Sequence, residues 1–159
     1  MYTTPVEAAL AYRQQQLSVV PIAPGAKHPP PGFAWAGRQG ALPTDEQVME
    51  DFRLHPRAGV GIVTGLVSGV VVLDVDPPRC SPETLASVRA DLEGRFRSCP
   101  RARTGGGGYH IYFTSPPVGL SNAVNIRPGL DLRANGGLVV APPTVHASGN
   151  PYLWEVPFR

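Results

Sequence analysis

The first apolar segment of the chain has the spacing of an amphipathic helix. Thr4 suits the N-cap position, Pro5 suits the first helical position, and Glu7 completes a capping box. The residues that follow would place small and aromatic side chains on one face of the helix. We therefore predict a helix that ends near residue 16 and buries Ala8, Ala9 and Tyr12.

Two later segments begin with the same kind of signal. Thr44 and Gln47 form a second capping box ahead of a run with helical spacing. Ser81 and Pro82 start a third predicted helix, because serine caps well and proline is favoured in the first turn. The inner side of this third helix is expected to consist of Leu85, Ala86, Val88 and Leu92.

The other apolar segments are short and bounded by glycine or proline, which is typical of β-strands. Gly59–Thr64 and Gly69–Asp76 are almost continuously apolar, which indicates burial on both faces, and residues 65–68 predict a hairpin turn between them. Further strands are predicted at Leu17–Ile22, Tyr109–Thr114, Gly129–Arg133, Gly137–Ala141 and Tyr152–Val156. This order of elements predicts an α+β fold, with a mostly antiparallel mixed sheet flanked by helices.

Composition narrows the class of protein. The 159 residues include 18 Gly and 19 Pro without a three-residue period, which excludes a collagen-like fibre, and the frequent prolines exclude a long coiled coil. A net charge of +2 is far from that of a histone-like or tail-driven nucleic-acid binder. Two cysteines are too few for a disulfide framework and indicate free thiols in a reducing compartment.

The chain shows neither the pattern of a secretory signal nor that of a membrane span. Residues 1–16 include Glu7 and Arg13 and lack an apolar core. The longest uncharged stretch, residues 58–73, is too short to span a bilayer and is broken by glycines. We therefore expect a soluble cytoplasmic protein without membrane contact.

Two aspartates at the end of a predicted strand are the first candidates for chemistry. Side chains at positions i and i+2 of a strand point to the same face, so Asp74 and Asp76 are expected about 6–7 Å apart, with Val75 pointing into the core. Two such carboxylates repel each other unless a cation lies between them, and Mg²⁺ prefers oxygen ligands of this kind. The alternative is that Asp76 and Pro77 merely start a turn.

Four consecutive glycines, residues 105–108, precede the predicted strand that carries His110. Glycine amides can approach an anion without interference from a Cβ, as phosphate cradles require. In the strand, His110 and Tyr112 are expected to share one face. The segment lacks the Gly-Lys-Ser/Thr of a P-loop and the helix of a dinucleotide site, so a flexible loop beside a structural histidine is the alternative.

Two more segments bring polar residues together. Asp131 and Arg133 share a predicted strand face, where Asp131 is either the third carboxylate of a two-metal site or half of a surface ion pair. The rigid Pro142-Pro143 turn displays Thr144 and His146, and it either holds a ligand or is only a stiff loop.

Together these segments resemble the primase-polymerase (Prim-Pol) domain of the archaeo-eukaryotic primase superfamily, which is found in plasmid, phage and mobile-element replication proteins. The resemblance runs from about residue 17 to residue 154, and the order and spacing of its short motifs make it specific. The motifs are the Pro24–Lys27 loop with Trp35, Gly61–Gly65, Val72–Asp76, Gly106–Phe113, Gly129–Arg133 and Val139–Gly149. The resemblance implies a single catalytic domain over residues 1–159 with an RRM-like core. Family members often continue into a helical primase domain and a helicase, so a fragment of a longer replication protein is an expected origin of this chain.

Residue by residue, the resemblance implies a nucleotidyltransferase site. Asp74, Asp76 and Asp131 would bind two Mg²⁺ or Mn²⁺ ions and, with His110, would form the catalytic set. Gly108 stands where the family commonly has serine, so backbone amides would have to substitute for the lost hydroxyl. The residues implied to bind the nucleotide are Lys27, Gly107, Gly108, His110, Arg133, Thr144 and His146.

The implied activity is that of a DNA primase and DNA polymerase. The 3′-hydroxyl of a primer or first nucleotide would attack the α-phosphate of a dNTP or NTP on a single-stranded DNA template, and pyrophosphate would leave. The template is expected on a basic surface formed by Arg95, Arg97, Arg101 and Arg103. Two other classes stay open: a non-catalytic module that binds single-stranded nucleic acid or nucleotide, and a metal-dependent glycosyltransferase that uses Asp74 and Asp76.

Overall fold

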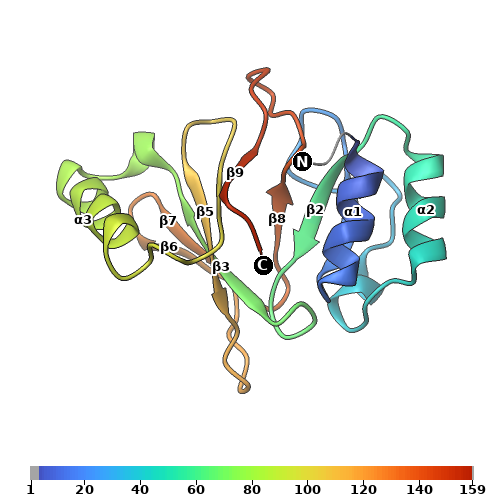
Figure 1. Ribbon diagram of the computed structural model, residues 1–159, viewed down its shortest axis with the longest axis horizontal. Coiled ribbons are helices and arrows are strands. Elements are labelled where there is room, and N and C mark those ends of the chain that lie inside the picture. The colour runs from blue at the N-terminus through green and yellow to red at the C-terminus, as the bar shows by residue number, and fades with distance from the viewer. Residues whose placement is uncertain (1–3, 159) are drawn as a thin grey trace.

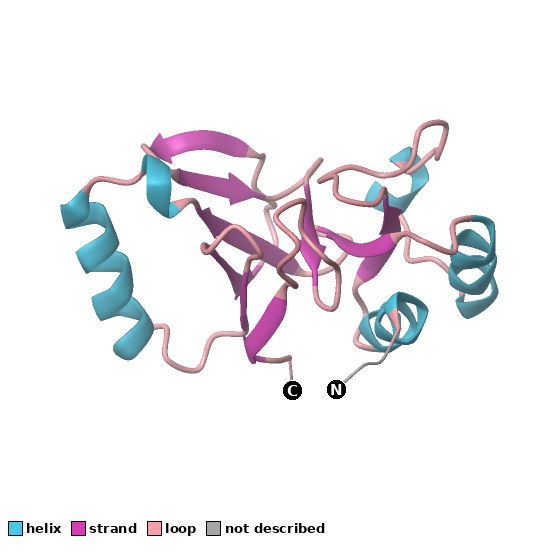
Figure 2. Ribbon diagram, turned by 90° about the horizontal axis from the view of Figure 1, so that it is seen from above, coloured by secondary structure: helices cyan, strands magenta, loops and turns pink. Residues whose placement is uncertain are grey.

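The computed structural model describes residues 4–158, so the outermost residues of the domain predicted over 1–159 lie outside the described range. Figure 2 shows helices on both sides of a central region of strands. The helices are α1 (Pro5–Gln14), α2 (Asp45–Leu54) and α3 (Pro82–Glu93), with short 3-10 turns η1 (Ala36–Gln39) and η2 (Pro77–Arg79). None of the helices between residues 4 and 158 is long and apolar enough to cross a membrane.

The strands form two separate antiparallel sheets, one of three strands and one of six (Figure 1). The smaller sheet has the order β1-β2-β8, and the larger has the order β6-β7-β3-β5-β4-β9. The predicted α+β fold with antiparallel strands flanked by helices is therefore confirmed. The strands are β1 (Ser18–Ile22), β2 (Gly59–Val63), β3 (Val70–Val75), β4 (Arg101–Arg103), β5 (Tyr109–Thr114), β6 (Ala123–Arg127), β7 (Leu130–Arg133), β8 (Leu138–Ala141) and β9 (Leu153–Val156).

The helix starts follow the sequence signals. At α1, Thr4 Oγ1 accepts the N–H of Glu7 at 3.3 Å, and the Glu7 carboxylate accepts the N–H of Thr4 at 3.1 Å. Thr44 and Gln47 form the equivalent box at α2. The predicted inward residues of α1 are buried: Ala8, Ala9 and Tyr12.

The prediction for the inner side of α3 is wrong at one position. Val88 and Leu92 are buried and Leu85 is half-buried, but Ala86 is exposed. Residues 85, 88 and 92 follow the three- and four-residue spacing of one helical stripe, whereas residue 86 lies outside it. The helix therefore packs on the larger sheet through this narrow stripe.

The predicted hairpin between Gly59–Thr64 and Gly69–Asp76 is also wrong. The tight turn exists, since Gly65 and Val70 exchange backbone hydrogen bonds of 2.6 and 3.3 Å, but the strands then part. β2 pairs with β1 and β8, whereas β3 pairs with β5 and β7. Each of the two is an interior strand of its own sheet, so both of its edges are already occupied.

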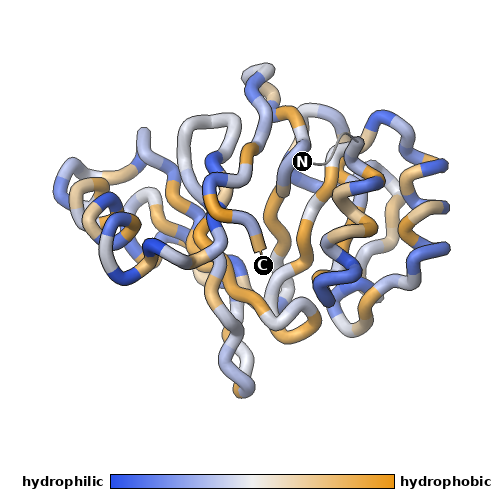
Figure 3. Tube along the Cα trace, in the orientation of Figure 1, coloured by the Kyte–Doolittle hydropathy of each residue, from blue (hydrophilic) through white to orange (hydrophobic). Residues whose placement is uncertain are grey.

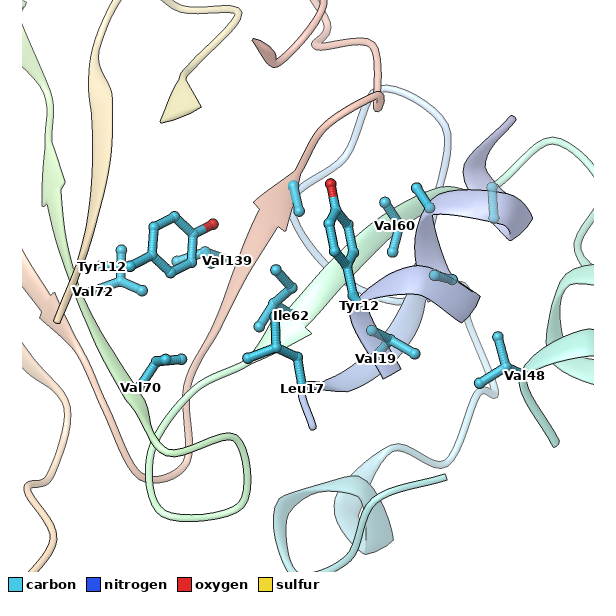
Figure 4. Close-up of a cluster of buried hydrophobic side chains, with 14 of the residues drawn as sticks. Tyr12, Leu17, Val19, Val48, Val60, Ile62, Val70, Val72, Tyr112 and Val139 are labelled. Carbon is cyan, nitrogen blue, oxygen red and sulfur yellow. The ribbon is translucent and has the colours of Figure 1, made fainter. Parts of the chain in front are cut away.

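Buried apolar side chains join the helices and the two sheets. One cluster combines Tyr12 of α1, Val60 and Ile62 of β2, and Val72 and Tyr112 of the larger sheet (Figure 4). The Cα trace coloured by hydropathy shows the apolar residues concentrated in the central strands (Figure 3). The meeting of the two sheets places one polar cleft beside this core.

Candidate active site

A cleft of about 250 Å³ opens where the carboxylate-bearing strands of the larger sheet face β8. Most of the predicted site residues line it, namely Lys27, Asp74, Asp76, His110, Asp131, Arg133 and His146. Arg79 also lines the cleft. Three positively charged side chains, those of Lys27, Arg79 and Arg133, therefore lie close to the three carboxylates. A cleft with both positive and negative side chains suits a ligand that combines phosphates with metal ions.

Strand register places the central groups of the cleft side by side. Asp74 of β3 lies opposite His110 of β5 on one side and opposite Asp131 of β7 on the other. Directly paired residues of antiparallel strands share a face, so all three side chains point into the cleft. Val75 points the other way and is buried against α3, as predicted. Asp76 lies just beyond the strand, as the N-cap of η2, and is exposed.

Arg133 bridges two of the carboxylates. Its Nη2 donates to Asp131 Oδ2 at 2.8 Å and lies 3.4 Å from Asp74 Oδ2. The other oxygen of Asp131, Oδ1, accepts the backbone N–H of Asn125 at 2.7 Å. The predicted common face of Asp131 and Arg133 is thus confirmed, and the two form a close ion pair.

His110 is buried between the two sheets. Its Nδ1 lies 3.0 Å from the Val140 carbonyl oxygen, and its Nε2 lies 3.5 Å from Asp74 Oδ1. A carbonyl oxygen only accepts hydrogen bonds, so Nδ1 carries a proton and Nε2 is the nitrogen presented to the cleft.

The surroundings of Asp74 stabilise its ionised form. Burial by itself would raise the pKa of this carboxyl, but the interactions with His110, Arg133 and Lys27 together outweigh the effect of burial. The pKa of Asp74 is consequently held below its ordinary value. At neutral pH the cleft therefore contains a carboxylate ready to bind a cation.

The glycine-rich loop is tied down by its own hydrogen bonds. The Gly108 amide donates to Thr104 Oγ1, and the Gly107 amide donates to the Thr104 carbonyl oxygen, both at 2.9 Å. The two amides predicted to cradle phosphate are thus engaged within the loop. Gly106 is the glycine of this loop that lines the cleft.

The two predicted site residues after the Pro142-Pro143 pair lie in different places. Thr144 is buried outside the cleft lining, and its hydroxyl bonds to both the N–H and the carbonyl oxygen of Val60, at 2.8 and 3.2 Å. These bonds fix β2 to the loop after β8. His146, by contrast, lines the cleft, and its Nδ1 lies 3.0 Å from the Ser148 hydroxyl.

Tyr152 is a cleft residue that the sequence reasoning missed, because only a strand was predicted there. Its ring lies between two histidines, with centroid distances of 5.8 Å to His110 and 6.0 Å to His146. Burial and the nearby Asp74 charge raise the pKa of Tyr152 to about 12, so its phenol stays neutral. The sequence reasoning also missed two other cleft residues, Thr104 and Arg79, the latter being the first basic residue after Asp76.

The basic cluster predicted to hold a template faces away from the cleft in part. Arg101 and Arg103 of β4 lie opposite Ile111 and Tyr109, whereas Ala102 lies opposite His110. Because cross-strand partners share a face, the two arginines project from the α3 side of the sheet. Arg101 also pairs with Glu155 at 3.0 Å, and Arg95 of the same cluster pairs with Asp91 at 2.7 Å.

The donor chemistry of the cleft fits Mg²⁺ or Mn²⁺, although a closed metal cage is not preformed. Between residues 4 and 158, no three His, Cys, Asp or Glu side chains are arranged as a ready metal site. Asp74, Asp76 and Asp131 nevertheless offer hard oxygen ligands around one cleft, and Arg133 stands between two of them. These ligands are of the type that both ions prefer.

Comparison with known proteins gives one positive result. The family model described as "Bifunctional DNA primase/polymerase, N-terminal" (Prim-Pol) matches residues 9–158. The match covers nearly the whole chain and includes every residue predicted for the site. The search of curated proteins found no match.

Proposed function

The chain belongs to the bifunctional DNA primase/polymerase (Prim-Pol) family, and from this we propose that its cleft catalyses template-directed nucleotidyl transfer. The substrates are a dNTP or NTP and the 3′-hydroxyl of a strand paired to single-stranded DNA. The observation that carries the proposal is the alignment of Asp131, Asp74 and His110 on adjacent strands of one sheet. Their side chains face the same cleft.

The three aspartates would hold the metal ions. Bound Mg²⁺ or Mn²⁺ supplies Lewis-acid stabilisation of the attacking and leaving oxygens. Asp74 and Asp131 reach the centre of the cleft from paired strands, and Asp76 approaches from the turn after β3. The lowered pKa of Asp74 keeps this ligand ionised over the range in which such an enzyme works.

The histidines and the basic side chains of the cleft would orient the triphosphate. His110 presents Nε2, while its Nδ1 proton is held by Val140, so the ring cannot turn away without losing that hydrogen bond. Lys27 and Arg79 lie around the same space and match the charge of phosphate oxygens, and His146 lines it as well. In the reaction, the 3′-oxygen bonds to the α-phosphorus, the bond to the bridging oxygen breaks, and the hydroxyl proton passes to water.

Primer extension tests the proposal directly. We expect Asp74→Asn and Asp131→Asn to lower the rate of nucleotide incorporation by at least about a hundredfold. Asp91→Asn is the matched control, because Asp91 lies on α3, on the other side of the sheet, and pairs with Arg95 just after that helix. Incorporation is read on a gel with a labelled primer, an unlabelled template and Mg²⁺ or Mn²⁺, and circular dichroism verifies folding. Undiminished extension by a folded cleft variant would overturn the proposal.

A further inference from the structure

In both Asp74 and Asp131, the two carboxylate oxygens contact different groups, and the arrangement is the same in the two residues. Each keeps Oδ1 on a fixed group of the fold: the Asp74 atom faces His110 Nε2 at 3.5 Å, and the Asp131 atom accepts the Asn125 N–H at 2.7 Å. Each directs Oδ2 to the same guanidinium nitrogen, Nη2 of Arg133, at 3.4 and 2.8 Å. The two Oδ2 atoms thus form a binding site for a cation, and the guanidinium of Arg133 occupies this site.

The position of Arg133 follows from electrostatics. Asp74 and Asp131 are direct cross-strand partners, and like charges in that relation destabilise a sheet. Their side chains are only 25% and 11% exposed, so water screens the repulsion weakly. A guanidinium between them offsets the repulsion, because it contacts one oxygen of each carboxylate.

Arg133 is also able to leave. Its side chain lines the cleft and is 30% exposed, and it has a long rotatable stem. The carboxylates would keep their other contacts after its departure, because those contacts involve Oδ1: the hydrogen bond from Asn125 to Asp131 and the approach of His110 to Asp74. A divalent cation is a better partner for two carboxylate oxygens than a singly charged guanidinium.

We propose that Arg133 is an exchangeable internal cation. It neutralises the Asp74–Asp131 pair in the metal-free protein, gives up the two Oδ2 atoms when a divalent ion binds, and then contacts the phosphates of the nucleotide in the same cleft. The exchange itself concerns metal binding alone; only the destination of the released guanidinium rests on the proposed function. A single movement of Arg133 would make metal and nucleotide binding mutually favourable.

Manganese binding without nucleotide tests the exchange. Arg133→Met removes the competing cation, so its affinity for Mn²⁺, followed by the electron paramagnetic resonance signal of the free ion, should rise at least about fivefold. Arg79→Met is the matched control, because it removes the same charge from the same cleft, but its hydrogen bond goes to the neutral Asn125 amide at 2.6 Å. If the loss of one positive charge were the whole cause, both substitutions would raise the affinity for Mn²⁺ equally. A larger increase in Arg133→Met than in Arg79→Met indicates exchange. Equal gains, or weaker Mn²⁺ binding by Arg133→Met, would refute the inference.

A second measurement uses the unaltered protein and so does not depend on the folding of a variant. The side-chain NMR signal of Arg133, assigned by through-bond correlation to its own backbone amide, should shift as Mg²⁺ is added, and the Arg133 side-chain protons should exchange faster with solvent. A signal that stays unchanged at saturating Mg²⁺ would show that the guanidinium remains on the carboxylates. Neither readout requires polymerase activity, so failure of the exchange and failure of the proposed function can be told apart.

Discussion

Gly108 determines how closely the glycine-rich loop approaches the strand that carries Asp74. A Cβ at this position would lie 2.1 Å from the Val75 carbonyl oxygen and 3.1 Å from Cδ of Pro77. At Gly106, two residues earlier, the nearest atom would be His146 Cε1 at 3.7 Å. The clash at Gly108 is with backbone, so the loop or the strand would have to move.

We therefore expect Gly108→Ser to lower the free energy of unfolding by about 1–3 kcal/mol. Gly106→Ala should change it by less than about 1 kcal/mol in either direction, because an ordinary contact replaces the clash. Urea unfolding followed by circular dichroism measures both. Similar values for the two variants would mean that the close approach at Gly108 carries little of the loop's stability.

The strand residues of the candidate site were identifiable from the sequence because their spacing indicates a common face, whereas Lys27 and His146 were identified through the family resemblance. Asp131 with Arg133, and His110 within its strand, needed only the two-residue period of a strand. The sequence could not reveal that the Gly107 and Gly108 amides bond within the loop, or that the Thr144 hydroxyl binds Val60. Those bonds depend on contacts between distant segments and on the exact path of a loop.

At the level of elements, the turn between β2 and β3 joins the two sheets. Gly65, in this turn, has φ +97°, and a Cβ on it would lie 2.1 Å from Asn135 Oδ1 and 2.7 Å from the Asn135 Cα. Gly69 has φ +64° and open space around it. Gly65 is therefore required both by its backbone conformation and by the close contact with Asn135. Gly69 is required by its backbone conformation alone.

Gly65→Ala should accordingly destabilise the fold by at least about 3 kcal/mol, since backbone strain and a clash with Asn135 add together. Gly69→Ala should cost about 1–2 kcal/mol, the strain of a left-handed residue alone. Chemical denaturation of the two variants side by side measures the difference. If Gly69→Ala proved the more damaging, the contact with Asn135 could not be what requires glycine at position 65.

The elements that sequence reasoning missed share a lack of pattern. β6 is exposed over nearly its whole length, and β4 is only three residues long, so neither has a buried–exposed alternation to detect. The hairpin error has the opposite cause. β2 and β3 both have strong apolar patterns, but such patterns indicate only that a strand is buried, not which strand lies beside it.

At the level of the whole molecule, the cleft requires both sheets. His110 of the larger sheet is held by the Val140 carbonyl of β8 in the smaller one, and Lys27 reaches the cleft from the loop after β1. Tyr12 of α1 makes a similar link, because its hydroxyl donates to the Pro142 carbonyl at 2.6 Å and accepts Trp154 Nε1–H at 2.7 Å. These long-range bonds predict that the two sheets unfold together.

Tyr12→Phe tests this cooperativity, because it removes the hydroxyl while keeping the ring in the core. It leaves the Pro142 carbonyl and the Trp154 N–H without their partner, and should lower the free energy of unfolding by about 1–3 kcal/mol. Trp35 packs near the smaller sheet and Trp154 near the larger one, so single-tryptophan variants report on each. Their fluorescence transitions in urea should coincide with each other and with circular dichroism, before and after the Tyr12 substitution. Separate transitions would show instead that each sheet is stable by itself, and the cleft would then depend on docking between two independent units.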